Sequence, residues 1–159
     1  MEHKRLSRLL LLAGWMAVLG CAFIFLLVLP LSGHGYYVHV PEVRMLYVPS
    51  LIYFWAAGVC SALALWQYMR ICRRIGENRS FCAENARDLR RIAHLLFICG
   101  GMLTGYCLVA CLPQVPFGPE LLFCLIAAMA YAAMGLLAWA LHRLIQQAVA
   151  LQEENDLTI

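Results

Sequence analysis

The stretch LLLLAGWMAVLGCAFIFLLVLPL, residues 9–31, decides the fold class of this chain. It holds no charged residue, and a bilayer core about 30 Å thick is crossed by about 20 apolar residues at about 1.5 Å each. A basic start, MEHKRLSR, precedes it, and the run exceeds the roughly 7–15 residues of a signal-peptide core. We therefore expect a retained transmembrane helix rather than a cleaved signal.

Three further apolar blocks follow, at about residues 50–68, 92–112 and 121–141. The chain is 64% hydrophobic and 13% charged, whereas soluble domains are roughly 45–50% apolar and about 25% charged. A transmembrane β-barrel would need shorter segments with strict alternation, which these blocks lack. The sequence predicts one all-α domain over residues 1–159, a four-helix transmembrane bundle.

Lysine and arginine predict the orientation, because they concentrate on the cytoplasmic side of membrane proteins. Eleven of the twelve fall on one predicted side, and only Arg44 falls on the other. The eleven are Lys4, Arg5, Arg8, Arg70, Arg73, Arg74, Arg79, Arg87, Arg90, Arg91 and Arg143. Both termini are therefore expected in the cytoplasm. The net charge of +3 belongs to the loops, so it does not indicate direct nucleic-acid binding.

The connections differ on the two sides. We expect outer loops at about residues 32–49 and 113–119, the second rich in proline. On the inner side, the second helix is expected to continue to Gly76, which would cap it in the left-handed conformation. Residues 77–80 read as a turn, and a new helix is expected near Cys82. The apolar spacing after residue 141 predicts that the fourth helix also continues, into a cytoplasmic tail.

The basic hairpin, residues 70–91, has two interpretations. Contact with anionic lipid is worth about 1 kcal/mol per basic residue near the surface, and it would account for the charge. A docking surface for a protein is the alternative, and Phe81 at the expected tip favours it, because an exposed aromatic side chain needs a place to bury.

Cysteine and histidine supply weaker candidates. No C-x-x-C pair occurs among the eight cysteines, but Cys107, Cys111 and Cys124 lie near the outer ends of two spans. A thiol–disulfide or quinone-linked redox protein is therefore an alternative function, against ordinary packing of small residues. His34, His39 and Glu42 match no metal-binding motif, so no metal or cofactor is expected.

Motifs for catalysis are absent, so we do not expect an enzyme. No charged residue lies at the centre of a span, which counts against a small transporter subunit, the further alternative. Gly101 and Gly105 form a G-x-x-x-G, and Ala128, Ala132 and Gly135 form a similar small face. Such faces serve helix packing within one chain or in a homo-oligomer.

Two segments resemble one family. They are RIGENRSFCAENARDLRRI, residues 74–92, and LQEENDLTI, residues 151–159. Together with the four-span layout they look like the bacterial membrane proteins grouped as domain of unknown function 2975. That family's hairpin typically reads G-x-P-F-S-x-E-N followed by L-R-x-I, and its chains end in E-x-D-L-T-I. Here Asn78, Ser80 and Cys82 depart from the pattern, and cysteine is a weaker helix cap than serine.

The resemblance implies a location in the bacterial inner membrane. Genes of this family often lie beside a gene for a small Cro-type helix-turn-helix regulator, which implies a membrane regulator or scaffold that binds such a protein. The residues expected to contact this partner are Arg73, Arg74, Phe81, Glu84, Asn85, Arg87, Leu89, Arg90, Glu153, Glu154, Asp156 and Leu157.

Overall fold

The computed structural model describes residues 2–39, 47–77, 82–110 and 119–156, and this part of the chain contains no strand. Its elements are α1 (Glu2–Phe23), the π-helix η1 (Ile24–Val28), α2 (Leu29–His39), α3 (Tyr47–Gly76), α4 (Ala83–Ala110) and α5 (Pro119–Asp156). Within the described residues, four segments are long and apolar enough to cross a membrane: Ser7–Gly35, Tyr47–Gly76, Ala83–Val109 and Leu121–Gln152. The predicted all-α, four-span fold is confirmed, and the length and composition of its helices make the chain a multi-pass membrane protein.

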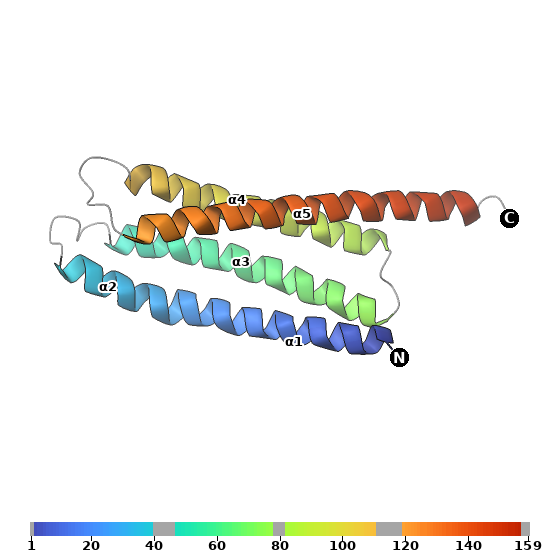
Figure 1. Ribbon diagram of the computed structural model, residues 1–159, viewed down its shortest axis with the longest axis horizontal. Coiled ribbons are helices and arrows are strands. Elements are labelled where there is room, and N and C mark those ends of the chain that lie inside the picture. Colours follow the sequence, from blue (N-terminus) through green and yellow to red (C-terminus); the bar gives the residue numbers. More distant parts are fainter. Residues whose placement is uncertain (1, 40–46, 78–81, 111–118, 157–159) are drawn as a thin grey trace.

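The helices lie roughly side by side along one axis (Figure 1), and each span packs against the next span in the chain. The rod formed by α1, η1 and α2 lies along α3, α3 lies along α4, and α4 has its most extensive contacts with α5. Both termini lie at the end where α3 finishes and α4 begins. We call this end, with the last turns of α5, the hairpin end. The extended hairpin and the helical tail expected from the sequence are both present.

The first span remains helical through Pro30 because a π-helix precedes it. The Leu29 N–H donates to the Ile24 carbonyl in η1, so it is not available to the Phe25 carbonyl. Pro30 has no N–H to offer in its place. The indole Nε1 of Trp55, on α3, donates to the Phe25 carbonyl at 3.1 Å. A side chain of the neighbouring span thus satisfies a backbone group that lipid would leave unpaired at a cost of several kcal/mol.

The first outer loop is shorter than expected. The prediction of a loop over residues 32–49 was wrong at both ends, because α2 continues to His39 and α3 begins at Tyr47. Pro49 lies in the first turn of α3, where its missing N–H would have had no helical partner. Pro119 is the first residue of α5, another position at which the missing N–H would have had no helical partner. The rest of the second loop, with its other two prolines, lies outside the described residues.

Gly76 is the last residue of α3, as expected, but it does not form the expected cap. Its φ lies outside the left-handed range, so the prediction of a left-handed cap was wrong. A Cβ at this position would lie 2.6 Å from the Ser7 Oγ. That hydroxyl donates to the Cys72 carbonyl at 2.8 Å, which joins the start of α1 to the end of α3. Gly76 therefore provides room for a contact between two helices.

Small residues bring α4 and α5 close together. A Cβ added to Gly100 would lie 3.4 Å from the Ala128 carbonyl oxygen, and one added to Gly135 would lie 3.0 Å from the Phe97 ring. Gly101, which begins the G-x-x-x-G, has nothing within 4 Å of its added Cβ and is exposed. The close approach therefore uses the glycine beside the motif. Among the described helices, α4 and α5 have the most extensive contact. Their close approach at Gly100 and Gly135 therefore also determines how the two helices lie at the hairpin end.

Candidate functional site

A cluster of charged side chains joins α3 to α4 at the hairpin end. Arg74 Nη1 donates to Asp88 Oδ2 at 2.6 Å and to Asn85 Oδ1 at 3.1 Å. Its Nε lies 3.3 Å from Glu84 Oε2. Asp88 and Asn85 are only 3% and 1% exposed, so these interactions are shielded from solvent. We call Arg74, Glu84, Asn85 and Asp88 the Asp88 cluster.

Two further arginines lie around the same carboxylate. Arg91 Nη1 is 3.7 Å from Asp88 Oδ1, and Arg70 Nε is 4.0 Å from Asp88 Oδ2. Both of these side chains are about half exposed, and their longer distances make their contributions smaller. Three arginines thus surround one buried carboxylate, and these contacts hold the start of α4 against α3.

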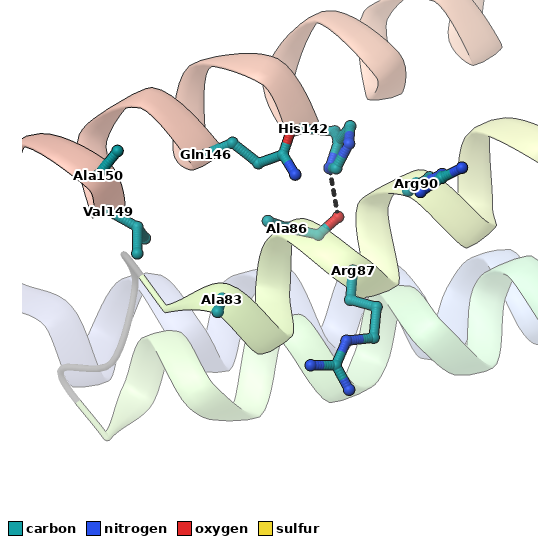
Figure 2. Close-up of a pocket in the computed structure, with 8 residues that line it drawn as sticks. All are labelled: Ala83, Ala86, Arg87, Arg90, His142, Gln146, Val149 and Ala150. Carbon is teal, nitrogen blue, oxygen red and sulfur yellow. Dashed lines mark hydrogen bonds between the residues drawn. The ribbon is translucent and has the colours of Figure 1, made fainter.

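The opposite face of the same α4 turns forms a groove with α5. Figure 2 shows this groove, of about 380 Å³, between residues 83–90 of α4 and residues 142–150 of α5. Its polar lining consists of Arg87, Arg90, His142 and Gln146, and alanines and one valine supply the rest. His142 is buried, and its Nδ1 lies 2.7 Å from the Ala86 carbonyl oxygen. A carbonyl only accepts, so this nitrogen carries the proton. We call this feature the α4–α5 groove.

Comparison with known families supports the resemblance seen in the sequence. The family described as Protein of unknown function (DUF2975) matches residues 36–159. The chain belongs to this family. The match begins directly after the first span, Ser7–Gly35, and covers α3, α4, α5 and the connections between them. No curated protein and no solved structure matches the chain.

The structure supplies a physical role for four motif residues of the DUF2975 family. Glu84 and Asn85, which match its E-N pair, both contact Arg74 across the turn of the hairpin. Leu89 packs against a hydrophobic cluster of buried residues to which Ile92 belongs, together with Ala64, Ala93 and Ala138. Cys82 precedes α4, and its carbonyl accepts the backbone N–H groups of Asn85 and Ala86. These parts of the motif hold the hairpin together.

The residues expected to contact a partner divide by exposure. Arg73, Glu84, Arg87, Arg90 and Glu154 are exposed. Arg74 and Leu89 are partly buried, and Asn85 is buried, so Asn85 can act on a partner only through the shape of the hairpin. Phe81 and Leu157 lie outside the described residues, and so do the side chains of Glu153 and Asp156. The partner itself stays a prediction.

Two residues of the redox alternative, Cys107 and Cys124, lie at the opposite end of the bundle from the hairpin end. Cys107 and Cys124 are buried, and the Cys107 thiol lies 4.0 Å from the Leu121 carbonyl oxygen across the α4–α5 interface. Cys111 lies outside the described residues. This alternative and the transporter alternative both stay predictions.

His34 and His39 lie on α2 and not in the outer loop, and no three histidine, cysteine or acidic side chains gather in the described part of the chain. The side chain of His39 lies outside the described residues. The His34 ring lies edge-on to Tyr47, with 6.2 Å between ring centroids. Glu42 lies outside the described residues.

Two residues of the hairpin end were not singled out from the sequence. In the sequence, Asp88 is one acidic residue within a basic segment, and His142 is a histidine at the expected membrane interface. The signal for Asp88 is its spacing on the predicted helix, four residues after Glu84 and three before Arg91, which places all three near one face. No comparable pattern marks His142, because its partner is a backbone carbonyl.

Proposed function

We propose that this protein is a non-enzymatic membrane regulator or scaffold whose hairpin end lies in the cytoplasm and binds a small helix-turn-helix regulator. The orientation is supported by charge, since eleven of the twelve basic residues belong to segments on the side of the hairpin end. The location that fits is the bacterial inner membrane, where this orientation gives both termini to the cytoplasm.

The observation that carries the proposal is the length of α5. This helix continues to Asp156, beyond the last residue of α3 and the first residue of α4, as Figure 1 shows. Its last turns are not needed to cross the bilayer, and they expose Leu151, at 66%, and Glu154. A helix that extends into water with an apolar and an acidic side chain three residues apart is a suitable surface for a protein partner.

The hairpin contributes charge of the opposite sign beside this tail. Arg73, Arg87 and Arg90 are exposed there, and Asp88 is enclosed by arginines of the same chain. The surface therefore offers cationic and acidic groups together, which suits a protein better than a nucleic acid, whose phosphates would be repelled by the acidic tail. Binding a DNA-binding regulator at the membrane would withhold it from its operator.

The test is recovery of the regulator encoded beside this gene when both proteins are co-expressed. We expect the regulator to sediment with membranes that contain the wild-type chain. Phe81→Ala combined with deletion of residues 153–159 should reduce this recovery about tenfold, because a few residues usually carry most of a binding energy. The matched control is Phe123→Ala, which removes an exposed phenylalanine at the opposite end of α5.

Two results would count against the proposal. One is recovery of the regulator that is the same with and without the membrane protein. The other is equal recovery with the wild type, the Phe81→Ala deletion variant and the Phe123→Ala control.

A further inference from the structure

The α4–α5 groove carries uncompensated positive charge. Around Asp88, the three arginines Arg70, Arg74 and Arg91 face a carboxylate. Arg87 and Arg90 line the groove instead, and neither forms an ion pair within the described residues. His142 and Gln146 add polar groups from α5, while Ala83, Ala86 and Val149 make other parts of the lining apolar. A cationic rim with an apolar lining fits an anionic amphiphile.

The depth of the groove indicates which amphiphile. Arg143 stacks on the Trp139 ring, with its guanidinium carbon 4.9 Å from the ring centroid. Tryptophan paired with a basic residue at the end of a span marks the membrane–water interface. The groove begins at His142, directly after the apolar block of residues 121–141, and extends away from this block over residues 142–150, about 12 Å of helix. Each headgroup layer is about 5–8 Å thick, so the first half of the groove lies at headgroup level.

We propose that the α4–α5 groove binds the headgroup phosphate of an anionic phospholipid from the surrounding leaflet. Arg87 and Arg90 are one turn apart on α4, and both side chains are exposed. In Figure 2 the Arg87 side chain points away from α5, so binding turns its guanidinium group toward the groove. There both arginines donate to phosphate oxygens, which guanidinium binds well. The apolar lining accommodates the glycerol and the first carbons of the chains. Lipid is the source of the phosphate, because the groove lies where lipid headgroups are concentrated. This inference needs no protein partner, so it stands apart from the proposed function.

The test uses the full chain in nanodiscs of phosphatidylcholine with a small fraction of phosphatidylglycerol. Phospholipid retained on the protein is measured by native mass spectrometry after release. Arg87→Gln combined with Arg90→Gln should weaken phosphatidylglycerol binding roughly tenfold to thirtyfold, from the usual contribution of two basic residues. The matched control, Arg8→Gln with Arg73→Gln, removes two exposed arginines of the hairpin end that do not line the groove, and it should change binding less than twofold.

A second variant tests the groove without changing charge. Ala150→Trp places a large side chain in the lining and should reduce phosphatidylglycerol retention at least fivefold while the helical circular dichroism is kept. Inorganic phosphate at millimolar concentration should not displace the lipid, and displacement would instead assign the groove to a free phosphate. Equal losses in the two arginine pairs, or full retention in Ala150→Trp, would overturn the proposal in favour of general surface attraction.

Discussion

Arg74→Met is expected to lower the free energy of unfolding by about 3 kcal/mol, because it leaves the buried Asp88 carboxylate without its nearest cation. The Arg74 Nη1 lies 2.6 Å from Asp88 Oδ2, and the Arg74 side chain is only 15% exposed. Arg70 and Arg91 remain nearby at 4.0 and 3.7 Å, which keeps the expected loss at the lower end of the range for a broken buried pair. Glu84 also loses its contact with the guanidinium group.

The measurement is unfolding in mixed micelles titrated with a denaturing detergent. The matched control is Arg73→Met, the exposed neighbour on the same helix, for which we expect a change below about 0.5 kcal/mol. Replacing both partners, as Arg74→Met with Asp88→Leu, should recover most of the loss because no buried charge is left alone. A loss for Arg74→Met no greater than for Arg73→Met would show that the Asp88 cluster does not hold the hairpin.

Gly100→Leu should destabilise the protein by about 2–3 kcal/mol, because it forces α4 away from α5. The position where its Cβ would stand is 3.4 Å from the Ala128 carbonyl oxygen and 3.7 Å from the Ala132 nitrogen. Both are backbone atoms, so no side-chain rotation relieves the overlap with the rest of the leucine.

The next residue provides the control. Gly101→Leu makes the same chemical change one position later, with nothing within 4 Å of the added Cβ. It should be neutral or slightly stabilising, since leucine has the higher helix propensity. The same detergent titration compares the two variants. Equal destabilisation by both would mean that α4 and α5 do not meet at Gly100 as described.

The sequence predicted the long-range layout well because lipid imposes it. Apolar blocks of spanning length permit little besides helices. The continuation of α3 to Gly76 and of α5 to Asp156 follows from the absence of proline and glycine in residues 69–75 and 142–156. The start of α4 at Ala83, with Glu84 in its first turn, was also expected from local signals.

What the sequence could not predict depends on contacts between segments. Pro30 is a stop signal when read alone, and the helix continues past it because η1 and the Trp55 indole satisfy the backbone there. Gly101 begins a recognisable motif, yet Gly100 is the glycine that faces α5. Rotating a helix by one residue changes the direction of a side chain by about 100° without altering the apolar pattern of a span that is apolar on all sides.

The candidate site was anticipated by region but not in detail. The basic hairpin and the acidic tail were identified from charge, and the sequence placed Asn85 among residues that contact a partner, whereas the structure buries it against Arg74. No sequence pattern predicted the α4–α5 groove, because its lining residues come from two helix segments that lie more than 50 residues apart in the chain.

The central claim is that the hairpin end, with both termini, lies in the cytoplasm. The most direct measurement fuses the full chain at its C-terminus either to green fluorescent protein, which fluoresces when it folds in the cytoplasm, or to alkaline phosphatase, which is active only after export. We predict bright fluorescence from the first fusion and no phosphatase activity from the second. An active phosphatase fusion with a dark fluorescent fusion would contradict the account, because the arginine-rich hairpin and the tail of α5 would then face away from any cytoplasmic partner.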